Sequence, residues 1–508
     1  MDSETLDSVL PKYGFGWMKV PFLRKLNALL FISMLASTNN GYDGSMLNGL
    51  QSMETWRDYF NHPTGQHLGT LSNGMLFGGI ACYPIAPWVC DTFGRRFPIA
   101  MGCVLIIIGS TIQACAQNYA MFLGGRMVLG FGSGFCTAGA PLLLSETSYP
   151  EHRFILTAIY NTLNPFGAML AAWLTLGTSF INSSSWSWRT PCLFQGFLPL
   201  VMLTMVYFVP ESPRYLIYKE RYSEARKLLV EYHAGGDEAS VLVDFEMAEI
   251  STAIELEKIA REYSYLDFFK TKGNRYRLFL LVMVAANTQL SGNALISYYL
   301  NLVLDSIGIV GTHPQLYVNA GLQIYSFVLD IIFACFVERA GRRKMFLFSF
   351  SGMLTTFIIW TILSALGQQE TPQFLNKNLS NGVLAMIFLC SMFYGSALQG
   401  LPFLYFTEIL PYQLRAKGLN IAQVTMTICS VFNGYVNPIA LEKIDWHYYI
   451  VWCCVLACFL TIAYFFYPET RGHSLETVRE VFGEDVVHVS AKEGEKIGRN
   501  DLKLEHLE

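Results

Sequence analysis

Long apolar stretches alternate with short polar ones along almost the whole chain of 508 residues. A membrane-spanning helix needs about 20 mostly apolar residues, because each residue advances the helix by only about 1.5 Å. About twelve stretches reach this length, and a polar stretch near 210–275 divides them six and six. The predicted spans lie near residues 26–49, 68–89, 98–117, 119–143, 154–180, 190–209, 277–306, 315–337, 345–367, 381–406, 416–438 and 447–467. The pattern predicts an all-α membrane protein with twelve transmembrane helices in two groups of six.

The positions of these spans divide the chain into five segments. They are a cytoplasmic N-terminal segment (1–25), a first six-helix bundle (26–209), a cytoplasmic linker (210–275), a second six-helix bundle (276–467) and a cytoplasmic tail (468–508). In the linker, apolar residues recur at helical spacing, which favours a small helical domain over a charged, solvated connection. Residues 1–22 lack the pattern of a signal peptide, so we expect the first span to direct membrane insertion.

Composition also favours a membrane protein. Only 15% of the residues are charged and 52% are hydrophobic, whereas a soluble domain carries about 25% charged residues. No basic, aromatic-rich patch points to a nucleic-acid partner. The 12 cysteines lie mostly in apolar runs without metal-ligand spacing, so we expect buried side chains, no metal and no cofactor. No enzymatic constellation is apparent.

Lys and Arg are concentrated in alternate loops, which predicts the orientation. With both termini in the cytoplasm, the inner loops receive most of them and the outer loops receive few, such as Arg57, Lys377 and Lys443. Cytoplasmic loops carry such an excess, so we expect both termini inside a multi-pass protein. The two glycosylation sequons, at Asn182 and Asn378, then fall in outer loops, where glycans are attached.

Three short motifs of the first half recur in the second half, in the same order and roughly 250 residues later. They are DTFGRR (91–96) with ERAGRR (338–343), SETSYPEHR (145–153) with TEILPYQLR (407–415), and PESPR (210–214) with PETRG (468–472). Three matches in register imply two parallel six-helix repeats. A transporter whose halves rock about a central site has this organisation.

The repeated motifs bring carboxylates and guanidinium groups to the cytoplasmic ends of the spans. Arg binds carboxylates with two hydrogen bonds, and such clusters can latch a gate in one state and release it in another. The alternative is that the positive charges only anchor the orientation. The candidate gate residues are Asp91, Arg95, Glu146, Arg153, Glu338, Arg342, Glu408 and Arg415.

Asp43 is an ionisable residue near the end of the first span, without a Lys or Arg within a dozen residues. A charge at the centre of a bilayer costs about 2.5–3.5 kcal/mol on insertion scales, so such residues are usually functional. Its partner must come from elsewhere in the chain. Arg126, in the fourth span, is another charged residue within the membrane.

The ordered motifs resemble those of the sugar porter family of the major facilitator superfamily over nearly the whole chain. Besides the repeats, they include GYDGSMLNGL (41–50), GGRMVLGFGSGF (124–135), WRTP (188–191) and QLSGNALISYY (289–299). Within that family, SGNALISYYLN (291–301) and FNGYVNPIALEKIDWHYYIVW (432–452) look like the fungal lactose permease and cellodextrin transporter branch.

The resemblance implies a mechanism for Asp43. In proton-coupled members of the family, an Asp in the first span faces an Arg in the fourth, and Asp43 and Arg126 match these positions. Protonation would remove the buried charge and permit the carrier to reorient. The alternative, a static structural ion pair, requires the same two residues.

A sugar site needs amides, hydroxyls and aromatic surfaces. Gln289 and Asn293 are four residues apart and are expected on one face of the seventh span. Asn293 stands one residue before the Asn of the family pattern, and Thr427 replaces a family Trp, which suggests a roomier cavity for a disaccharide. For any one polar residue, hydrogen bonding between helices is the alternative. The candidate substrate-binding residues are Asn161, Gln289, Asn293, Tyr298, Tyr299, Gln323, Phe403 and Asn433.

The expected function is import of a disaccharide or oligosaccharide, similar to lactose or cellobiose, with protons across the plasma membrane by alternating access. The expected partners are the sugar, protons and the lipid bilayer, and the expected state is a monomer. The alternatives are a proton-independent sugar facilitator, a sugar sensor that signals, and a carrier for a polyol or quinate.

Overall fold

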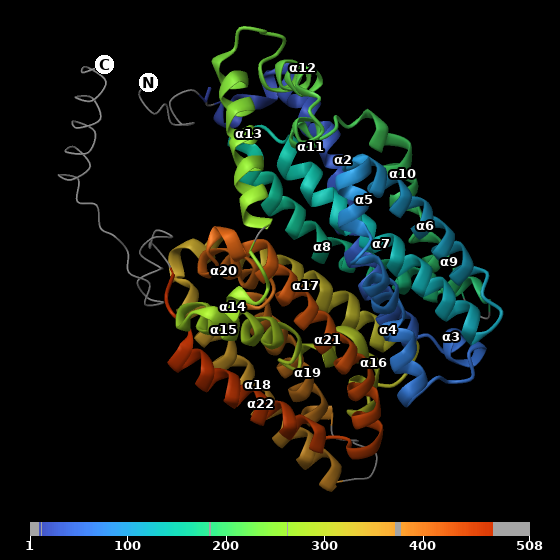
Figure 1. The fold of residues 1–508 in the computed structure, drawn as a ribbon. Helices are drawn as coiled ribbons and strands as arrows, with labels where there is room; N and C mark the ends of the chain where they lie inside the picture. The colour runs from blue at the N-terminus through green and yellow to red at the C-terminus, as the bar shows by residue number, and fades with distance from the viewer. Residues whose placement is uncertain (1–9, 12, 182–183, 262, 371–376, 471–508) are drawn as a thin grey trace, which may run out of the picture.

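The computed structural model describes residues 10–11, 13–181, 184–261, 263–370 and 377–470, and these form two helical bundles that lie side by side (Figure 1). The first bundle consists of α2 (Pro21–Gln51), α4 (Gly65–Cys82) with α5 (Ala86–Phe93), α6 (Arg96–Ala114), α7 (Tyr119–Thr147), α8 (Pro150–Ser179) and α9 (Trp186–Phe194) with α10 (Phe197–Met205). The second consists of α15 (Lys272–Gln289) with α16 (Asn293–Ser306), α17 (Thr312–Ala340), α18 (Arg342–Glu370), α19 (Lys377–Ala397) with α20 (Leu401–Ile409), α21 (Tyr412–Ile444) and α22 (His447–Phe466).

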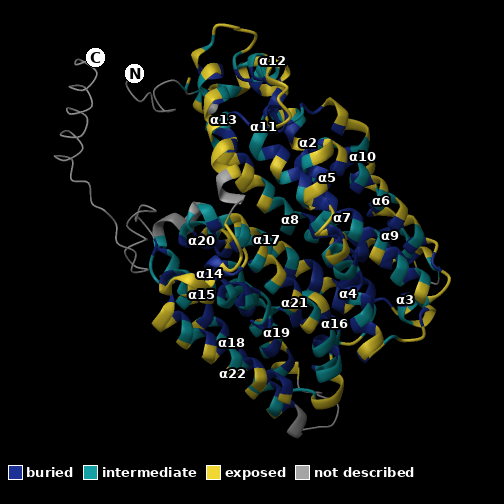
Figure 2. Ribbon diagram, viewed as in Figure 1, coloured by how far each residue is buried: buried dark blue, intermediate teal, exposed yellow. Residues whose placement is uncertain are grey.

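The predicted fold class is confirmed, because each of the twelve predicted spans corresponds to one helix or to a broken pair of helices. Ten helical segments of the described chain are long and apolar enough to cross a membrane by themselves. The exceptions are α2 and α4, which carry polar and glycine residues toward the protein interior. Large apolar residues are exposed, for example Phe31, Trp88 and Phe465, as expected of helices that face lipid. Figure 2 shows exposed positions along the outer helices of both bundles.

Close approach of α2 and α8 positions the polar part of α2. A Cβ atom at Gly41 would lie 1.9 Å from the carbonyl oxygen of Asn164, and one at Gly167 would lie 1.8 Å from that of Thr38. Small residues allow the backbones of membrane helices to come together in this way. Any larger residue at Gly41 or Gly167 would force the two helices apart.

The segment between the bundles is also helical. It contains α11 (Pro213–Tyr218), α12 (Tyr222–His233), α13 (Val241–Arg261) and α14 (Asp267–Lys270). A small apolar cluster holds α11, α12 and α13 together, and its buried residues are Tyr215, Leu216, Ile217, Ala225 and Ile254. These three helices lie at one end of the first bundle (Figure 1). We call this end of the molecule the linker side and the other end the opposite side.

Candidate functional site

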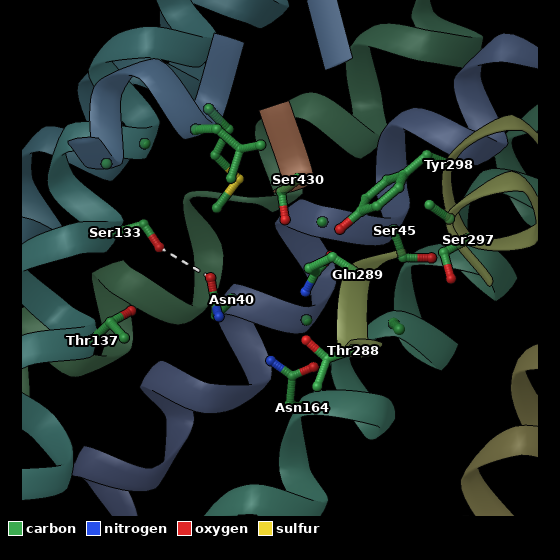
Figure 3. A pocket seen from close by; sticks show the side chains of 18 of the residues that line it. Asn40, Ser45, Ser133, Thr137, Asn164, Thr288, Gln289, Ser297, Tyr298 and Ser430 are labelled. Atoms are coloured by element: carbon green, nitrogen blue, oxygen red, sulfur yellow. Dashed lines mark hydrogen bonds between the residues drawn. The ribbon is translucent and has the colours of Figure 1, made fainter. Parts of the chain in front are cut away.

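A cavity of about 920 Å³ lies between the two bundles. Its wall is formed by α2, α4, α5, α7 and α8 of the first bundle and by α15, α16, α17, α19 and α21 of the second. Amides and hydroxyls from both bundles face one another across it, including Asn40, Asn164, Gln289 and Tyr298 (Figure 3). The cavity therefore offers both donors and acceptors of hydrogen bonds on opposing walls.

Four of the predicted substrate-binding residues line this cavity: Gln289, Asn293, Tyr298 and Gln323. Gln289 ends α15 and Asn293 begins α16, so the two do not share one continuous helix as the spacing predicted. The break lies at Gly292, whose φ of +85° is a left-handed conformation that glycine adopts without strain. Both residues reach the cavity because the break redirects the chain there.

The other four predicted substrate-binding residues do not line the cavity. Tyr299 is fully buried at a kink in α16, and its hydroxyl donates to the Gly434 carbonyl oxygen at 2.6 Å. The Asn433 amide donates to the carbonyl oxygen of Gln289 at 2.5 Å. Asn161 is exposed, and Phe403 is also exposed, with its ring against Phe406.

Sequence reasoning missed several polar residues of the wall. Asn164 stands one helical turn after Asn161 and lines the cavity, as do Asn40 and Ser133, which are joined by a hydrogen bond of 3.3 Å (Figure 3). Helical periodicity could have indicated Asn164. Residues three apart lie on the same side of a helix, so Asn164 was a candidate as soon as Asn161 was one. Asp330, a second carboxylate, was missed as well.

Asp43 is completely buried beside the cavity. The amide of Asn39 donates to one carboxylate oxygen at 2.8 Å, and the amide of Gln195 donates to the other at 3.0 Å. Gln195 lies at the break between α9 and α10, which brings its side chain into the bundle. Two amide donors therefore stabilise the carboxyl group without supplying a positive charge.

Arg126 lines the cavity but does not form an ion pair of 4.0 Å or less with Asp43. Its Nε atom is buried and has no hydrogen-bond partner among the described residues. Because both oxygens of Asp43 already accept hydrogen bonds from amides, the guanidinium is not needed to hold the carboxyl group in this conformation. The structure thus places the predicted proton-coupling residues in one region without joining them directly.

Hydrogen bonds between the bundles close the cavity on the opposite side. The amide of Gln51 in α2 donates to the Tyr298 carbonyl oxygen at 3.1 Å, and that of Asn73 in α4 donates to the Val431 carbonyl oxygen at 3.2 Å. Toward the linker side, the wall continues along Tyr83 and Pro87 of the first bundle and Gln423 of the second. Two hydrogen bonds of 3.4 Å join the bundles there, from the Gln423 amide to the Tyr83 hydroxyl and between the hydroxyls of Tyr83 and Thr427. We conclude that the opposite side is closed and that the cavity extends toward the linker side, where these longer bonds cross it.

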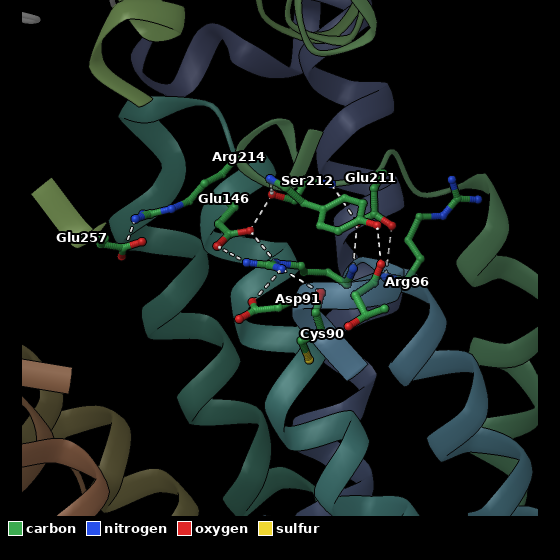
Figure 4. A network of polar contacts seen from close by, with 11 residues as sticks. Cys90, Asp91, Arg96, Glu146, Glu211, Ser212, Arg214 and Glu257 are labelled. Atoms are coloured by element: carbon green, nitrogen blue, oxygen red, sulfur yellow. Dashed lines mark hydrogen bonds and ion pairs between the residues drawn. The ribbon is translucent and has the colours of Figure 1, made fainter. Parts of the chain in front are cut away.

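A cluster of charged residues holds the linker side of the first bundle together (Figure 4). The Arg95 guanidinium pairs with Glu146 at 3.0 Å and with Asp91 at 3.5 Å, while Ser212 donates to Glu146 and the backbone amide of Arg95 donates to Glu211 at 3.0 Å. Burial by itself would lower the pKa of Arg95, but the neighbouring Glu146 carboxylate outweighs it and leaves the pKa above its usual value. The guanidinium therefore stays charged in this cluster.

The second bundle repeats this arrangement with the residues of the repeated motifs. The Arg342 guanidinium pairs with Glu408 at 2.8 Å, Thr470 donates to Glu408, and the backbone amide of Arg342 donates to Glu469 at 2.8 Å. Gly341 has a φ of +88°, and a Cβ atom there would lie 2.8 Å from the Glu469 carboxylate. We refer to the two sets as the first-bundle cluster (Asp91, Arg95, Glu146, Glu211, Ser212) and the second-bundle cluster (Arg342, Glu408, Glu469, Thr470).

Two predicted gate residues stay outside these clusters. Arg153 is exposed at the start of α8, and no ion pair joins it to a residue that the structure describes. Arg415 lies in α21 with a buried Nε atom that has no described partner. The side chain of Glu338 and the predicted glycosylation residue Asn182 lie outside the described part of the structure, while Asn378 is exposed in the first turn of α19.

Comparison with known proteins identifies a matching protein family and similar proteins. The family model described as "Sugar (and other) transporter" matches residues 29–482. The chain is 31% identical to the MFS-type transporter oryC of Aspergillus oryzae, covering 90% of this chain and 86% of that protein. It is 26% identical to the high-affinity glucose transporter of Kluyveromyces lactis, covering 93% and 88%.

Solved structures support the fold. The inward open conformation of the xylose transporter XylE from E. coli superimposes with a TM-score of 0.72 over 90% of this chain and 99% of that chain, at 18% identity. XylE bound to 6-bromo-6-deoxy-D-glucose, where it is described as a proton:xylose symporter, superimposes with a TM-score of 0.70. At this identity the likeness concerns the arrangement of the helices.

Proposed function

The chain belongs to the sugar (and other) transporter family of the major facilitator superfamily, and from this premise we propose that it imports a disaccharide or oligosaccharide together with protons. A substrate similar to lactose or cellobiose is favoured by the resemblance of 291–301 and 432–452 to the fungal lactose permease and cellodextrin transporter branch. Substrate enters the cavity between the bundles, which open alternately to the two sides of the membrane.

The observation that carries proton coupling is the environment of Asp43. Its carboxyl group is fully buried and receives two amide hydrogen bonds, but no cation lies within 4.0 Å of it among the described residues. An ionised carboxylate without a counterion is costly in the membrane interior, and the usual solution is to bind a proton. Asp43 in this conformation is therefore suited to carry a proton.

Arg126 supplies the second half of this mechanism. When Asp43 loses its proton, the carboxylate needs a positive charge, and the guanidinium that borders the adjacent cavity is the nearest candidate. Approach of Arg126 would stabilise the ionised form, and its withdrawal would favour proton uptake. The separation of the two groups in this conformation favours such a cycle over a permanent ion pair.

The cavity has room for a substrate larger than one sugar ring. Its volume of about 920 Å³ lies near the upper end of the usual range for small-molecule sites, which is about 300–1,000 Å³. Gln289, Asn293 and Gln323 supply amides, and Tyr298 supplies an aromatic ring with a hydroxyl. Such groups match the hydroxyls and the apolar ring faces of a sugar.

The linker side is assigned to the cytoplasm because Arg95, Arg96, Arg342 and Arg343 lie there. With this assignment the conformation faces inward, both termini are cytoplasmic, and the protein acts in the plasma membrane as a monomer. When the inner side closes, Arg153 and Arg415 are available to join the clusters and latch it.

The proton gradient is large enough to drive concentrative uptake. One proton that crosses a membrane potential of about 100 mV releases about 2.3 kcal/mol, which supports about a fifty-fold higher concentration of sugar inside.

The test is uptake of radiolabelled cellobiose, lactose, maltose and glucose in a host without its own sugar carriers. We expect concentrative uptake of a disaccharide that a protonophore abolishes, and we expect Asp43→Asn to abolish it as well. Concentrative uptake that survives Asp43→Asn, or uptake that never exceeds equilibrium in the wild type, would favour a facilitator. Sugar binding without any uptake would favour a sensor, and transport of a polyol or quinate alone would reject a sugar substrate.

A further inference from the structure

A second membrane-embedded carboxylate, Asp330, borders the cavity from the second bundle. It belongs to α17, is only partly buried, and has no hydrogen bond or ion pair to any residue that the structure describes. It lies outside every repeated motif. Because an isolated charge within a membrane protein is rare without a function, this residue requires an explanation.

Asp330 completes a polar stripe along α17. Gln323, Ser326 and Asp330 all line the cavity, and their spacing of three and four residues places them on one face of the helix. The stripe covers about 10 Å along the helix axis. Asp330 is at its linker-side end, since α17 runs toward the second-bundle cluster.

The neighbouring helix leaves room for this carboxylate. A Cβ atom at Gly395 in α19 would lie only 2.5 Å from the Oδ1 atom of Asp330. Ser391 and Tyr394 line the same part of the cavity, but the Tyr394 hydroxyl already donates to the Thr288 carbonyl oxygen at 3.1 Å. The carboxylate oxygens of Asp330 thus keep their capacity to accept hydrogen bonds from a ligand.

Asp330 borders the open cavity, where water can solvate an ionised carboxylate, whereas Asp43 is fully buried. An ionised carboxylate accepts several hydrogen bonds and donates none, and its bonds to hydroxyls are stronger than those between neutral groups. Adjacent hydroxyls of a sugar ring present two donors that one carboxylate can bind together. We infer that Asp330 binds the hydroxyls of the sugar ring nearest the linker side, while Gln289 and Asn293 hold the other ring of a disaccharide. This inference rests on the proposed function and adds a second ring subsite to it.

The carboxyl groups of Asp43 and Asp330 have different environments and therefore different roles. Asp43 is fully buried and both of its oxygens are engaged by amides, so no substrate hydroxyl can reach it in this conformation. Asp330 borders the open cavity and has no described partner. Replacement of Asp330 should therefore weaken substrate binding and leave proton coupling intact.

The experiment compares Asp330→Asn and Asp330→Glu with wild type, using radiolabelled cellobiose and lactose and recording sugar-evoked current in the same cells. Ser391→Ala is the control for a small change on the same part of the wall. We expect Asp330→Asn to raise the KM about ten-fold or more, because the variant loses one charge-assisted hydrogen bond to the substrate. Asp330→Glu should recover part of this loss, and the maximal rate and the charge moved per sugar should stay near wild type.

Two results would overturn the inference while leaving the proposed function standing. One is an unchanged KM in both Asp330 variants at wild-type surface expression. The other is a changed ratio of charge to sugar in Asp330→Asn, which would make Asp330 a second proton carrier. If the wild type neither takes up nor responds electrically to any disaccharide, the proposed function fails and the second ring subsite fails with it.

Discussion

The two ends of the bundles are held together in different ways. On the opposite side, the bundles bind each other directly through neutral groups, such as the Gln51 amide on the Tyr298 carbonyl oxygen and the Asn73 amide on the Val431 carbonyl oxygen. On the linker side, the Arg95–Glu146 and Arg342–Glu408 ion pairs each connect helices of one bundle.

This difference separates the contacts that must break from those that must persist. A hydrogen bond between neutral groups contributes about 0.5–1.5 kcal/mol, so a closed end built from such bonds can open and close repeatedly. Removing one partner of a buried ion pair costs about 3–5 kcal/mol, so the two clusters resist change. We infer that the clusters preserve the internal shape of each bundle while the bundles move relative to each other.

The largest effect is expected from Arg95→Gln. It leaves the Glu146 carboxylate without its cation in a site where only 10% of that side chain is exposed, and it should lower the stability by about 3 kcal/mol. Most of the transport should be lost together with this stability. Thermal unfolding of the purified protein and uptake in cells measure the two effects.

Arg221→Gln is the matched control for Arg95→Gln, because Arg221 pairs with Glu224 at the surface, where both side chains are about half exposed. Such pairs contribute little, so near wild-type behaviour is expected. Arg342→Gln should reproduce the Arg95→Gln defect in the second bundle. A wild-type melting temperature for both cluster variants would show that the clusters do not maintain the bundles.

A smaller effect is expected from Gln51→Ala, which removes a bond between the bundles on the opposite side. The variant loses about 1 kcal/mol of the free energy that stabilises the conformation open to the linker side. The ratio of this conformation to the alternative should therefore fall about five-fold. Labelling of a cysteine introduced as Ser391→Cys in the cavity wall should then become slower from the linker side.

Gln315→Ala is the control for this shift. Gln315 is buried at the same end of the molecule, but its amide donates within the second bundle, to Asp305 at 2.6 Å and to the Ile309 carbonyl oxygen at 3.1 Å. It should reduce stability without changing the labelling rate of the folded protein. Equal labelling rates in Gln51→Ala and Gln315→Ala would contradict the distinction between contacts that break during transport and contacts that persist.

The smallest effect is expected from Arg57→Gln. Arg57 and Asp305 approach across the bundles on the opposite side, but their atoms are 3.9 Å apart and both side chains are a quarter to a third exposed. Such a pair contributes less than about 1 kcal/mol, and high salt screens it further. A change in uptake greater than about five-fold at physiological salt would assign this pair a role that its geometry does not support.

The sequence predicted the features that depend on local pattern. Apolar run length indicated the helices, and the recurrence of DTFGRR as ERAGRR indicated that carboxylates and guanidinium groups gather at the ends of the spans. The structure forms two such clusters of similar geometry, one in each bundle. Asp43 could be identified because a single charge stands out in an apolar stretch. Each of these signals is visible within a few neighbouring residues.

The features that depend on helix rotation could not be predicted in the same way. Asn161 is the position that the family resemblance indicates, but residues three apart differ by about 60° around a helix, and it is Asn164 that lines the cavity while Asn161 is exposed. The break at Gly292 and the kink at Tyr299 change the rotation again, which turns Tyr299 into the packed interior. Gln195 could not be predicted because its role follows from a contact with Asp43, far away in the chain. Asp330 is different, since it is a lone carboxylate in the predicted span 315–337 and carries the same local signal as Asp43.

The most direct test of the account measures current and exchange on the same proteoliposomes, using the disaccharide that the wild type accumulates. We predict that the sugar evokes an inward current in the wild type. Asp43→Asn should give no current and yet still exchange labelled for unlabelled sugar, because the neutral amide mimics the protonated carboxyl group. A sugar-evoked current of wild-type size in Asp43→Asn would contradict the claim that this carboxyl group carries the proton.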